Sequence, residues 1–292
     1  MLTARHSLHD RGMSGASWTV RRRVTATAAA SRTGAAPTEP WDHSAVPLAV
    51  VPIALLVGLF IGAVGVGGVG LPPALTWFAG LDPHTAAGTS SCSFLFTGLA
   101  GTVVYARHRA MPWRFTGWLT LGVVFAAVPG ALVNGLLPDR VVLVPLGVFV
   151  TAAGAWQVLF RVRTLPHRTN LPPPAAVTTG AVVGFCSALT GTGGPVFLVP
   201  VLLALGIPTV TAVAAGQLIQ LPLVCFATVG YAVQGSVDVR LACLIGVIAA
   251  AGVVIGARIT LRLPERHLQR VASTALLGFG AVVLSSAWLT IH

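Results

Sequence analysis

Residues 62–73, "GAVGVGGVGLPP", interrupt an otherwise apolar segment with five glycines and two prolines. Each glycine inside a helix costs about 1 kcal/mol relative to alanine, and each proline costs about 3 kcal/mol. A continuous helix through this stretch is therefore unfavourable. The sequence predicts a hydrophobic segment that is broken in its middle, and the rest of the chain has to explain why.

The chain outside this stretch has the composition of a membrane protein. Its 292 residues are 55% hydrophobic and 9% charged, whereas soluble domains are about 25% charged. From about residue 46, apolar runs of the length that crosses a bilayer, about 20 residues, follow one another. The net charge of +11 comes from arginines in the N-terminal tail and in short loops, as the positive-inside rule expects. We therefore expect an all-α, multi-pass protein of the cytoplasmic membrane that does not bind nucleic acid.

The hydropathy pattern predicts about eight transmembrane helices. Their ranges are 46–68 with a short continuation to 79, 85–106, 114–137, 140–160, 175–195 continuing to 206, 210–233, 239–261 and 268–290. Before them, the Arg-, Ala- and Ser-rich residues 1–45 have no apolar core and are expected to be a disordered basic tail.

The apolar region divides into two homologous four-helix halves. A shift of 126 residues places Gly67 on Gly193, Tyr105 on Tyr231, and "LPDR" at 137–140 on "LPER" at 263–266. We predict a first repeat over 46–160, a cytoplasmic linker over 161–174, and a second repeat over 175–292. Internal repeats of this kind are typical of transporters.

The arginines of the loops predict the orientation of the chain. The tail, the loop at 107–114 and the linker at 161–174 are placed in the cytoplasm, together with both termini. The loop that carries Arg262 and Arg266 then falls on the outer side and violates the rule. Either this exception is real, or one glycine-rich segment is re-entrant and changes the count.

The second copy of the glycine-rich stretch is "ALTGTGGPVFLVP" at residues 188–200. Interrupted helices at matching places of two halves are a strong sequence indicator of a transport site. At such a break a half-helix begins, and its unpaired N–H groups and positive dipole end favour an anion. We therefore predict that Gly67, Gly68, Gly193 and Gly194 bind substrate. The alternative, close packing between helices, is preferred for Gly58, Gly62 and Gly130.

Polar side chains follow each break. "GTSSCS" includes Ser90 and Ser91, and at the 126-residue offset Ser91 falls on Gln217, with Gln220 three residues further on. Residues three apart share one face of a helix. We expect Ser90, Ser91, Gln217 and Gln220 to add neutral hydrogen-bond donors to the anion site.

These motifs resemble the sulfite exporter TauE/SafE family over about residues 50–290. The resemblance rests on the two glycine-rich segments that lead to proline, on "AAGTSS" and "AVAAGQ" after them, and on the duplicated halves. The family pattern often has three consecutive glycines, whereas this chain has Val69 and Pro195 at the third position. The resemblance implies a transporter of small sulfur-containing anions, such as sulfite or organosulfonates.

A membrane-embedded enzyme and a structural membrane subunit are the competing interpretations. The histidines lie in loops and termini, the four cysteines form no C-x-x-C pair, and no cluster has metal-ligand spacing. We therefore predict no catalytic residue, metal or cofactor. The partners are the small anion and the lipid bilayer, and association into a homo-oligomer is left open. Because no carboxylate or histidine lies within a span, facilitated export fits at least as well as proton coupling.

Overall fold

The computed structural model describes most of the apolar region. The described residues are 50–138, 147–149, 151–152, 155, 171–264, 267–268, 270–275, 277–278 and 280–281. They lie in one compact unit, Val46–His292. The predicted tail, most of the linker, and most of the predicted helices 140–160 and 268–290 lie outside the described residues.

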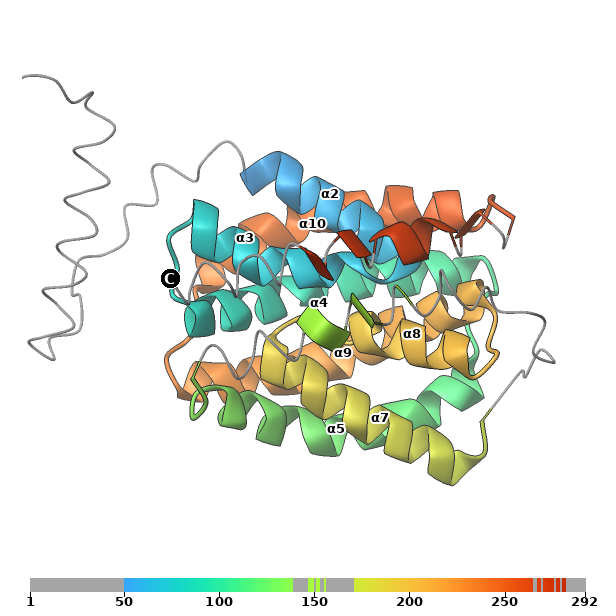
Figure 1. Ribbon diagram of the computed structural model, residues 1–292, viewed down its shortest axis with the longest axis horizontal. Helices are drawn as coiled ribbons and strands as arrows, with labels where there is room; N and C mark the ends of the chain where they lie inside the picture. The colour runs from blue at the N-terminus through green and yellow to red at the C-terminus, as the bar shows by residue number, and fades with distance from the viewer. Residues whose placement is uncertain are drawn as a thin grey trace, which may run out of the picture. The chain divides into compact units, whose positions relative to one another are not determined.

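The elements of the described ranges are all helical (Figure 1). They are α2 (Val50–Val64), the 3-10 helix η2 (Gly67–Gly70), α3 (Leu71–Phe78), α4 (Pro83–Arg107), α5 (Trp113–Asn134), α7 (Pro173–Thr190), α8 (Pro195–Ala204), α9 (Thr209–Val233) and α10 (Val239–Thr260). Five of these helices, α4, α5, α7, α9 and α10, are long and apolar enough to cross a membrane. The all-helical, multi-pass class predicted from composition is confirmed.

The helix boundaries repeat at the offset seen in the sequence. A shift of 126 residues carries both ends of α4 onto the ends of α9, and both ends of α5 onto the ends of α10. Two of the starts share a cap, because Asp82 accepts from the N–H of Thr85 and Asp238 accepts from the N–H of Leu241. Such caps satisfy N–H groups that the first turn leaves unpaired.

The first helix of each half packs against the last described long helix of the other half. The helix α2 packs in parallel on α10, where a Cβ on Gly58 would lie 2.0 Å from the Ala249 oxygen. Equivalently, α7 packs in parallel on α5, where a Cβ on Gly180 would lie 2.1 Å from the Leu119 oxygen. Gly62 and Gly130 make similar approaches to backbone oxygens. The packing role predicted for Gly58, Gly62 and Gly130 is therefore confirmed.

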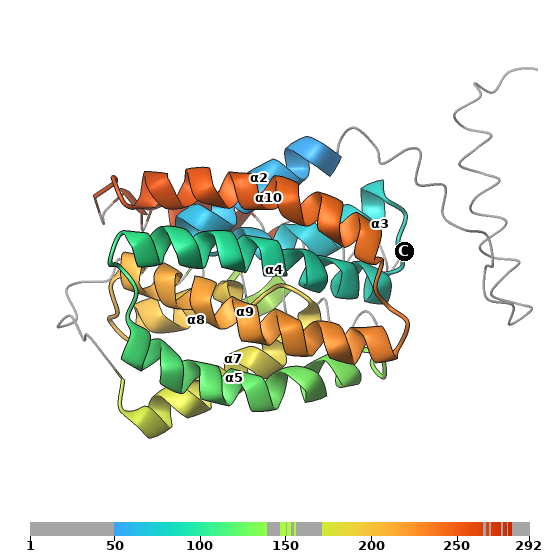
Figure 2. The same cartoon turned by 180° about the vertical axis from the view of Figure 1, so that it is seen from behind.

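The helices α4 and α9 cross in antiparallel directions at the centre of the bundle (Figure 2). Gly98 of α4 faces Gln220 of α9, and Gly101 faces Gln217. Gln220 Nε2 donates to the oxygen of Phe94, 2.8 Å away and 126 residues distant in sequence. A residue thus bonds its own repeat counterpart, which places the pseudo-twofold axis that relates the halves beside this contact.

Both glycine-rich segments are helical hairpins that turn back. A groove between α2 and α3 is lined by Pro52 and Ile53 from the start of α2 and by Trp77 and Phe78 from the end of α3. The helix α3 therefore runs back along α2. Since α2 and α4 both run parallel to α10, the chain enters α4 at the end where α2 began.

The second hairpin has the same arrangement but starts at the opposite end of the bundle. The helices α7 and α9 both run parallel to α5, so the chain starts α7 and starts α9 at one end of the bundle. The expected spans 46–79 and 175–206 therefore do not carry the chain across. The re-entrant alternative left open by the sequence applies to both glycine-rich segments.

Because of these hairpins, the charged loops are assigned to the two sides of the membrane differently than the sequence predicted. Because α4 and α10 are parallel, the loops after Arg107 and after Thr260 lie at the same end, and Arg262 no longer violates the positive-inside rule. Val50 lies at the opposite end from the loop at 108–112. Between Val50 and this loop only α4 runs from one end of the bundle to the other. The prediction of two spans there, 46–68 and 85–106, is therefore wrong for the first of them.

Candidate functional site

The two predicted breaks are present at matching positions. In the first, α2 ends at Val64, Gly65 has φ 77°, and η2 leads into α3. In the second, α7 ends at Thr190, and Gly191, Gly193 and Gly194 have φ between 53° and 72° before α8 begins at Pro195. Only glycine adopts positive φ without steric cost. The glycines therefore allow the reversals that form the hairpins.

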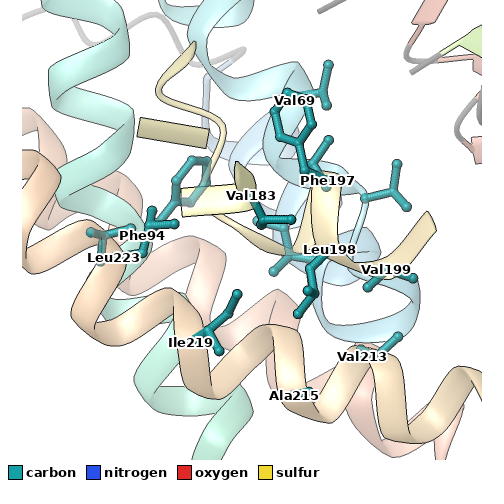
Figure 3. Packing of buried hydrophobic residues seen from close by; sticks show 14 of the residues in the cluster. Val69, Phe94, Val183, Phe197, Leu198, Val199, Val213, Ala215, Ile219 and Leu223 are labelled. Carbon is teal, nitrogen blue, oxygen red and sulfur yellow. The ribbon is translucent and has the colours of Figure 1, made fainter. Parts of the chain in front are cut away.

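The tips of the two hairpins meet beside the middle of α4. A Cβ on Gly68 would lie 2.2 Å from the oxygen of Thr192 and 3.4 Å from the ring of Phe94. A Cβ on Gly193 would lie 2.6 Å from the same ring. Figure 3 shows Phe94, Ile219 and Leu223 among the buried side chains around this meeting point. The irregular backbone is thus enclosed by protein, as it must be at membrane depth.

Side chains from three other helices cap the carbonyl end of α2. A helix leaves its last carbonyls unpaired, and here three consecutive carbonyls each accept a side-chain donor. The donors are Gln217 Nε2 to Ile61 at 3.0 Å, Tyr105 OH to Gly62 at 2.8 Å, and Thr260 Oγ1 to Ala63. Three of the last four carbonyls of α2 are therefore held by side chains of other helices.

The carbonyl end of α7 repeats two of these three bonds. Tyr231 OH donates to Ala188 O, and Asn134 Nδ2 donates to Leu189 O at 2.7 Å. The third pair, Gln217 with Ile61, corresponds to Ser91 with Ser187. The Ser91 side chain is buried, and the Ser187 hydroxyl is buried without a partner among the described residues. The second break therefore keeps the Ser187 hydroxyl unpaired within the described ranges.

Backbone donors in the second break are also unpaired. The residues Gly193 and Gly194 are buried, and neither N–H donates to a described residue. No side chain caps α8, and Pro195 has no N–H to contribute. The nearest atoms to a Cβ on Gly194 are apolar, from Leu223 and Ile219 at 3.6–3.8 Å. The second break thus combines neutral donors with an apolar wall, which is the chemistry of a small-anion site.

The other predicted site residues use their donors within the protein. Ser90 Oγ lies 3.0 Å from both Ala87 O and Gly191 O, so it ties α4 to the second break. Gln220 Nε2 is shared between Phe94 O and Thr97 Oγ1. Both glutamines retain a buried Oε1 atom without a partner. Gly67 lies against α2, where its Cβ would meet the Val57 oxygen at 2.2 Å.

The structure therefore brings Gly68, Ser90, Gly193 and Gly194 to the meeting point of the hairpins. It places Gln217 and Gln220 on the adjoining face of α9, with their donors bound to carbonyls. Whether these residues and Gly67 and Ser91 bind substrate stays a prediction.

Several residues that shape the site were missed by the sequence reasoning. These residues are Phe94, Tyr105, Asn134, Ser187, Tyr231 and Thr260. Tyr105 and Tyr231 are the two tyrosines of the chain, and they are 126 residues apart. Their identity at one offset was a usable signal for a shared structural role. The positions equivalent to Ser187 and Asn134 hold different residues, so the repeat alone did not reveal them.

Comparison with known proteins places the chain among membrane transporters. The model of the family described as "Sulfite exporter TauE/SafE" matches residues 50–283, with a further match at 16–107. The probable membrane transporter protein YjnA of Bacillus subtilis is 26% identical over 248 residues, which cover 80% of this chain and 98% of YjnA. The probable membrane transporter protein y4hK of Sinorhizobium fredii is 30% identical over 167 residues, which cover 56% of this chain and 66% of y4hK.

The probable membrane transporter protein MJ0441 of Methanocaldococcus jannaschii is 23% identical over 261 residues, which cover 81% of this chain and 96% of MJ0441. No solved structure matches the chain at a significant level. The match of the family model extends over both hairpins and over α4, α5, α9 and α10. The chain therefore belongs to the sulfite exporter TauE/SafE family of membrane transporters.

Proposed function

We propose that the chain exports a small sulfur-containing anion, such as sulfite or an organosulfonate, across the cytoplasmic membrane. The proposed binding site is the second break. The observation that carries this proposal is the set of neutral donors there without a described partner: the N–H groups of Gly193 and Gly194 and the hydroxyl of Ser187. Membership of the family supports the transporter class, and its name supports the choice of sulfur-containing anions.

A bound anion would offset the energetic cost of the unpaired donors at this site. A buried donor without a partner is unfavourable, and the start of α8 adds the positive end of a helix dipole. A hydrogen bond to a charged partner is worth about 1.5–3 kcal/mol. An anion would therefore satisfy donors that the protein leaves unpaired. Because the described donors are neutral, binding remains weak enough to allow release on the other side.

The remaining predicted residues form the first-break side of the proposed site. Gly67 and Gly68 line the opposing hairpin, whereas Ser90, Gln217 and Gln220 hold the hairpins to α4 and α9. If these donors are to contact the anion, they must exchange their present carbonyl partners. We therefore propose that they join the site only when the hairpins shift.

The arrangement of the hairpins supports an alternating-access cycle. One hairpin starts from each end of the bundle, and their tips meet beside the pseudo-twofold axis at Gln220. Transporters with inverted repeats open by moving one repeat against the other around a fixed site. The two described carboxylates, Asp82 and Asp238, cap helix starts. We therefore propose export down a gradient, without proton coupling through them.

Flux into proteoliposomes tests the proposal. The purified chain would be reconstituted and assayed with sulfite, sulfate, thiosulfate, sulfoacetate and taurine, with and without a pH gradient. We expect saturable flux of at least one sulfur oxyanion that does not require the pH gradient. Protein-free liposomes and the variant Gly194→Leu are the controls. Equal flux in all three preparations would contradict the transport proposal.

A further inference from the structure

The described arginines gather at one end of the bundle. Six of the seven lie where α4 ends, where α5 begins, and at or after the end of α10. They are Arg107, Arg109, Arg114, Arg258, Arg262 and Arg270, and we name them the arginine patch. The seventh, Arg240, starts α10 at the opposite end, where the two described carboxylates, Asp82 and Asp238, also lie.

The two loops of the arginine patch are neighbours in space. The backbone N–H of Asp238 donates to Thr89 Oγ1, and a Cβ on Gly246 would lie 2.9 Å from the Ser93 oxygen. This parallel register of α4 and α10 brings the end of α4, with Arg107, to the level of the end of α10. The described part of the chain therefore concentrates positive charge on one surface.

Nothing in the described ranges neutralises this charge. All six side chains are exposed, and none forms an ion pair with a described carboxylate, since both carboxylates cap helices at the other end. Like charges held together repel one another, so the surface gains from an external anion. Guanidinium groups bind phosphate oxygens in paired, directional hydrogen bonds.

Aromatic side chains place this surface at the depth of lipid headgroups. Trp113, beside Arg114, is 59% exposed, and Trp118 is 45% exposed. Exposed tryptophans of membrane proteins concentrate at the boundary between headgroups and acyl chains. The arginine patch therefore sits where the phosphates of the surrounding lipids lie, whereas a soluble anion would meet it only transiently.

We propose that the arginine patch binds the headgroups of anionic phospholipids at the cytoplasmic leaflet. Arginines near a negatively charged bilayer each contribute about 1 kcal/mol, which is roughly fivefold in affinity. Loss of three charges is therefore expected to weaken binding by about two orders of magnitude. This inference is independent of the transported substrate, because none of the six arginines contributes to either break.

Lipid titration of the purified full chain tests the proposal. The chain in a neutral detergent would be titrated with short-chain phosphatidylglycerol or phosphatidylcholine, with the melting temperature and native mass spectra as readouts. We expect phosphatidylglycerol alone to bind and to raise the melting temperature, with an effect that decreases at high salt. The triple variant Arg109→Gln/Arg114→Gln/Arg262→Gln should lose this response, whereas the matched control Arg240→Gln should keep it.

Three outcomes would overturn the proposal. Equal responses to the two lipids would show that the headgroup charge is not recognised. An unchanged response in the triple variant would place the lipid site elsewhere. An equal response to inorganic phosphate would identify a free-anion site in place of a lipid surface. If the triple variant does not fold, the three single variants and the salt series on the unaltered chain give the same decision.

Discussion

The two breaks have one architecture but different hydrogen bonding. In both, a tyrosine of the following long helix caps a carbonyl at the end of the broken helix. In the first break, Gln217 reaches the Ile61 carbonyl and closes the set of bonds. In the second, the equivalent acceptor is the Ser187 carbonyl, which accepts from the backbone N–H groups of Gly191 and Thr192, and Ser91 stands in place of Gln217. The duplicated frame therefore fixes where the breaks lie, and the difference at this residue pair leaves the buried Ser187 hydroxyl of the second break without a described partner.

The largest effect is expected where the hairpins touch. Gly68→Leu should abolish folding, because its Cβ would lie 2.2 Å from the Thr192 oxygen, which belongs to the other hairpin. Monodispersity after solubilisation measures this effect. Gly194→Leu is the matched variant: its Cβ meets only ordinary contacts at 3.6 Å or more, although its φ of 53° is strained. We expect Gly194→Leu to insert but to lose transport, so normal flux would assign the motif to helix packing alone.

Gln217→Leu tests whether the first break contributes to binding. We predict that it weakens anion affinity by about one to two orders of magnitude, because an amide donor is lost. It also leaves the Ile61 carbonyl without its side-chain partner, which should reduce stability by about 1–3 kcal/mol. Affinity and unfolding would be measured separately on purified protein. A loss of stability with unchanged affinity would show that Gln217 only holds the hairpin.

Ser187→Ala and Ser91→Ala test the second break. Because the Ser187 hydroxyl has no partner in the described structure, its removal should leave the melting temperature nearly unchanged. Each hydroxyl that binds the anion contributes affinity, so we expect the Kd to rise about five- to tenfold, less than for Gln217→Leu. Isothermal titration with the transported anion would measure this. Unchanged Kd values in both variants would place the anion elsewhere.

The tyrosine pair tests the symmetry of the frame. Tyr105→Phe and Tyr231→Phe each remove one hydrogen bond to a helix-end carbonyl. Each should cost about 1 kcal/mol, and the two costs should be similar because the contacts are equivalent. Reversible unfolding in mixed micelles can compare the two variants. A cost confined to one of them would show that the two frames are not energetically equivalent.

The smallest effect is expected at Arg258, in the last turn of α10. Its side chain is exposed and belongs to neither break, and long basic side chains near helix ends extend toward the interface. Arg258→Gln should leave the KM for transport unchanged. A large rise in KM with normal expression would instead make Arg258 a direct substrate contact.

The sequence alone determined the class of protein and the places where its helices break. Both follow from local properties: the hydropathy of 20-residue windows, and the cost of glycine and proline within a helix. The 126-residue repeat also predicted the matching boundaries of α4 with α9 and of α5 with α10. Local properties carry this information because they depend on neighbouring residues only.

The tertiary structure decided the direction of the chain after each break and the use of each donor. The helix α3 turns back beside α2 and also packs on α4, and hydropathy does not distinguish a hairpin from a span. Gln217 and Ile61 are 156 residues apart in sequence, so their bond exists only when α9 and α2 are placed together. The unpaired donors of Ser187, Gly193 and Gly194 are likewise defined by which partners the folded chain fails to bring within reach. Hydrogen-bond satisfaction is a property of the assembled helices, and a pattern of residues cannot supply it.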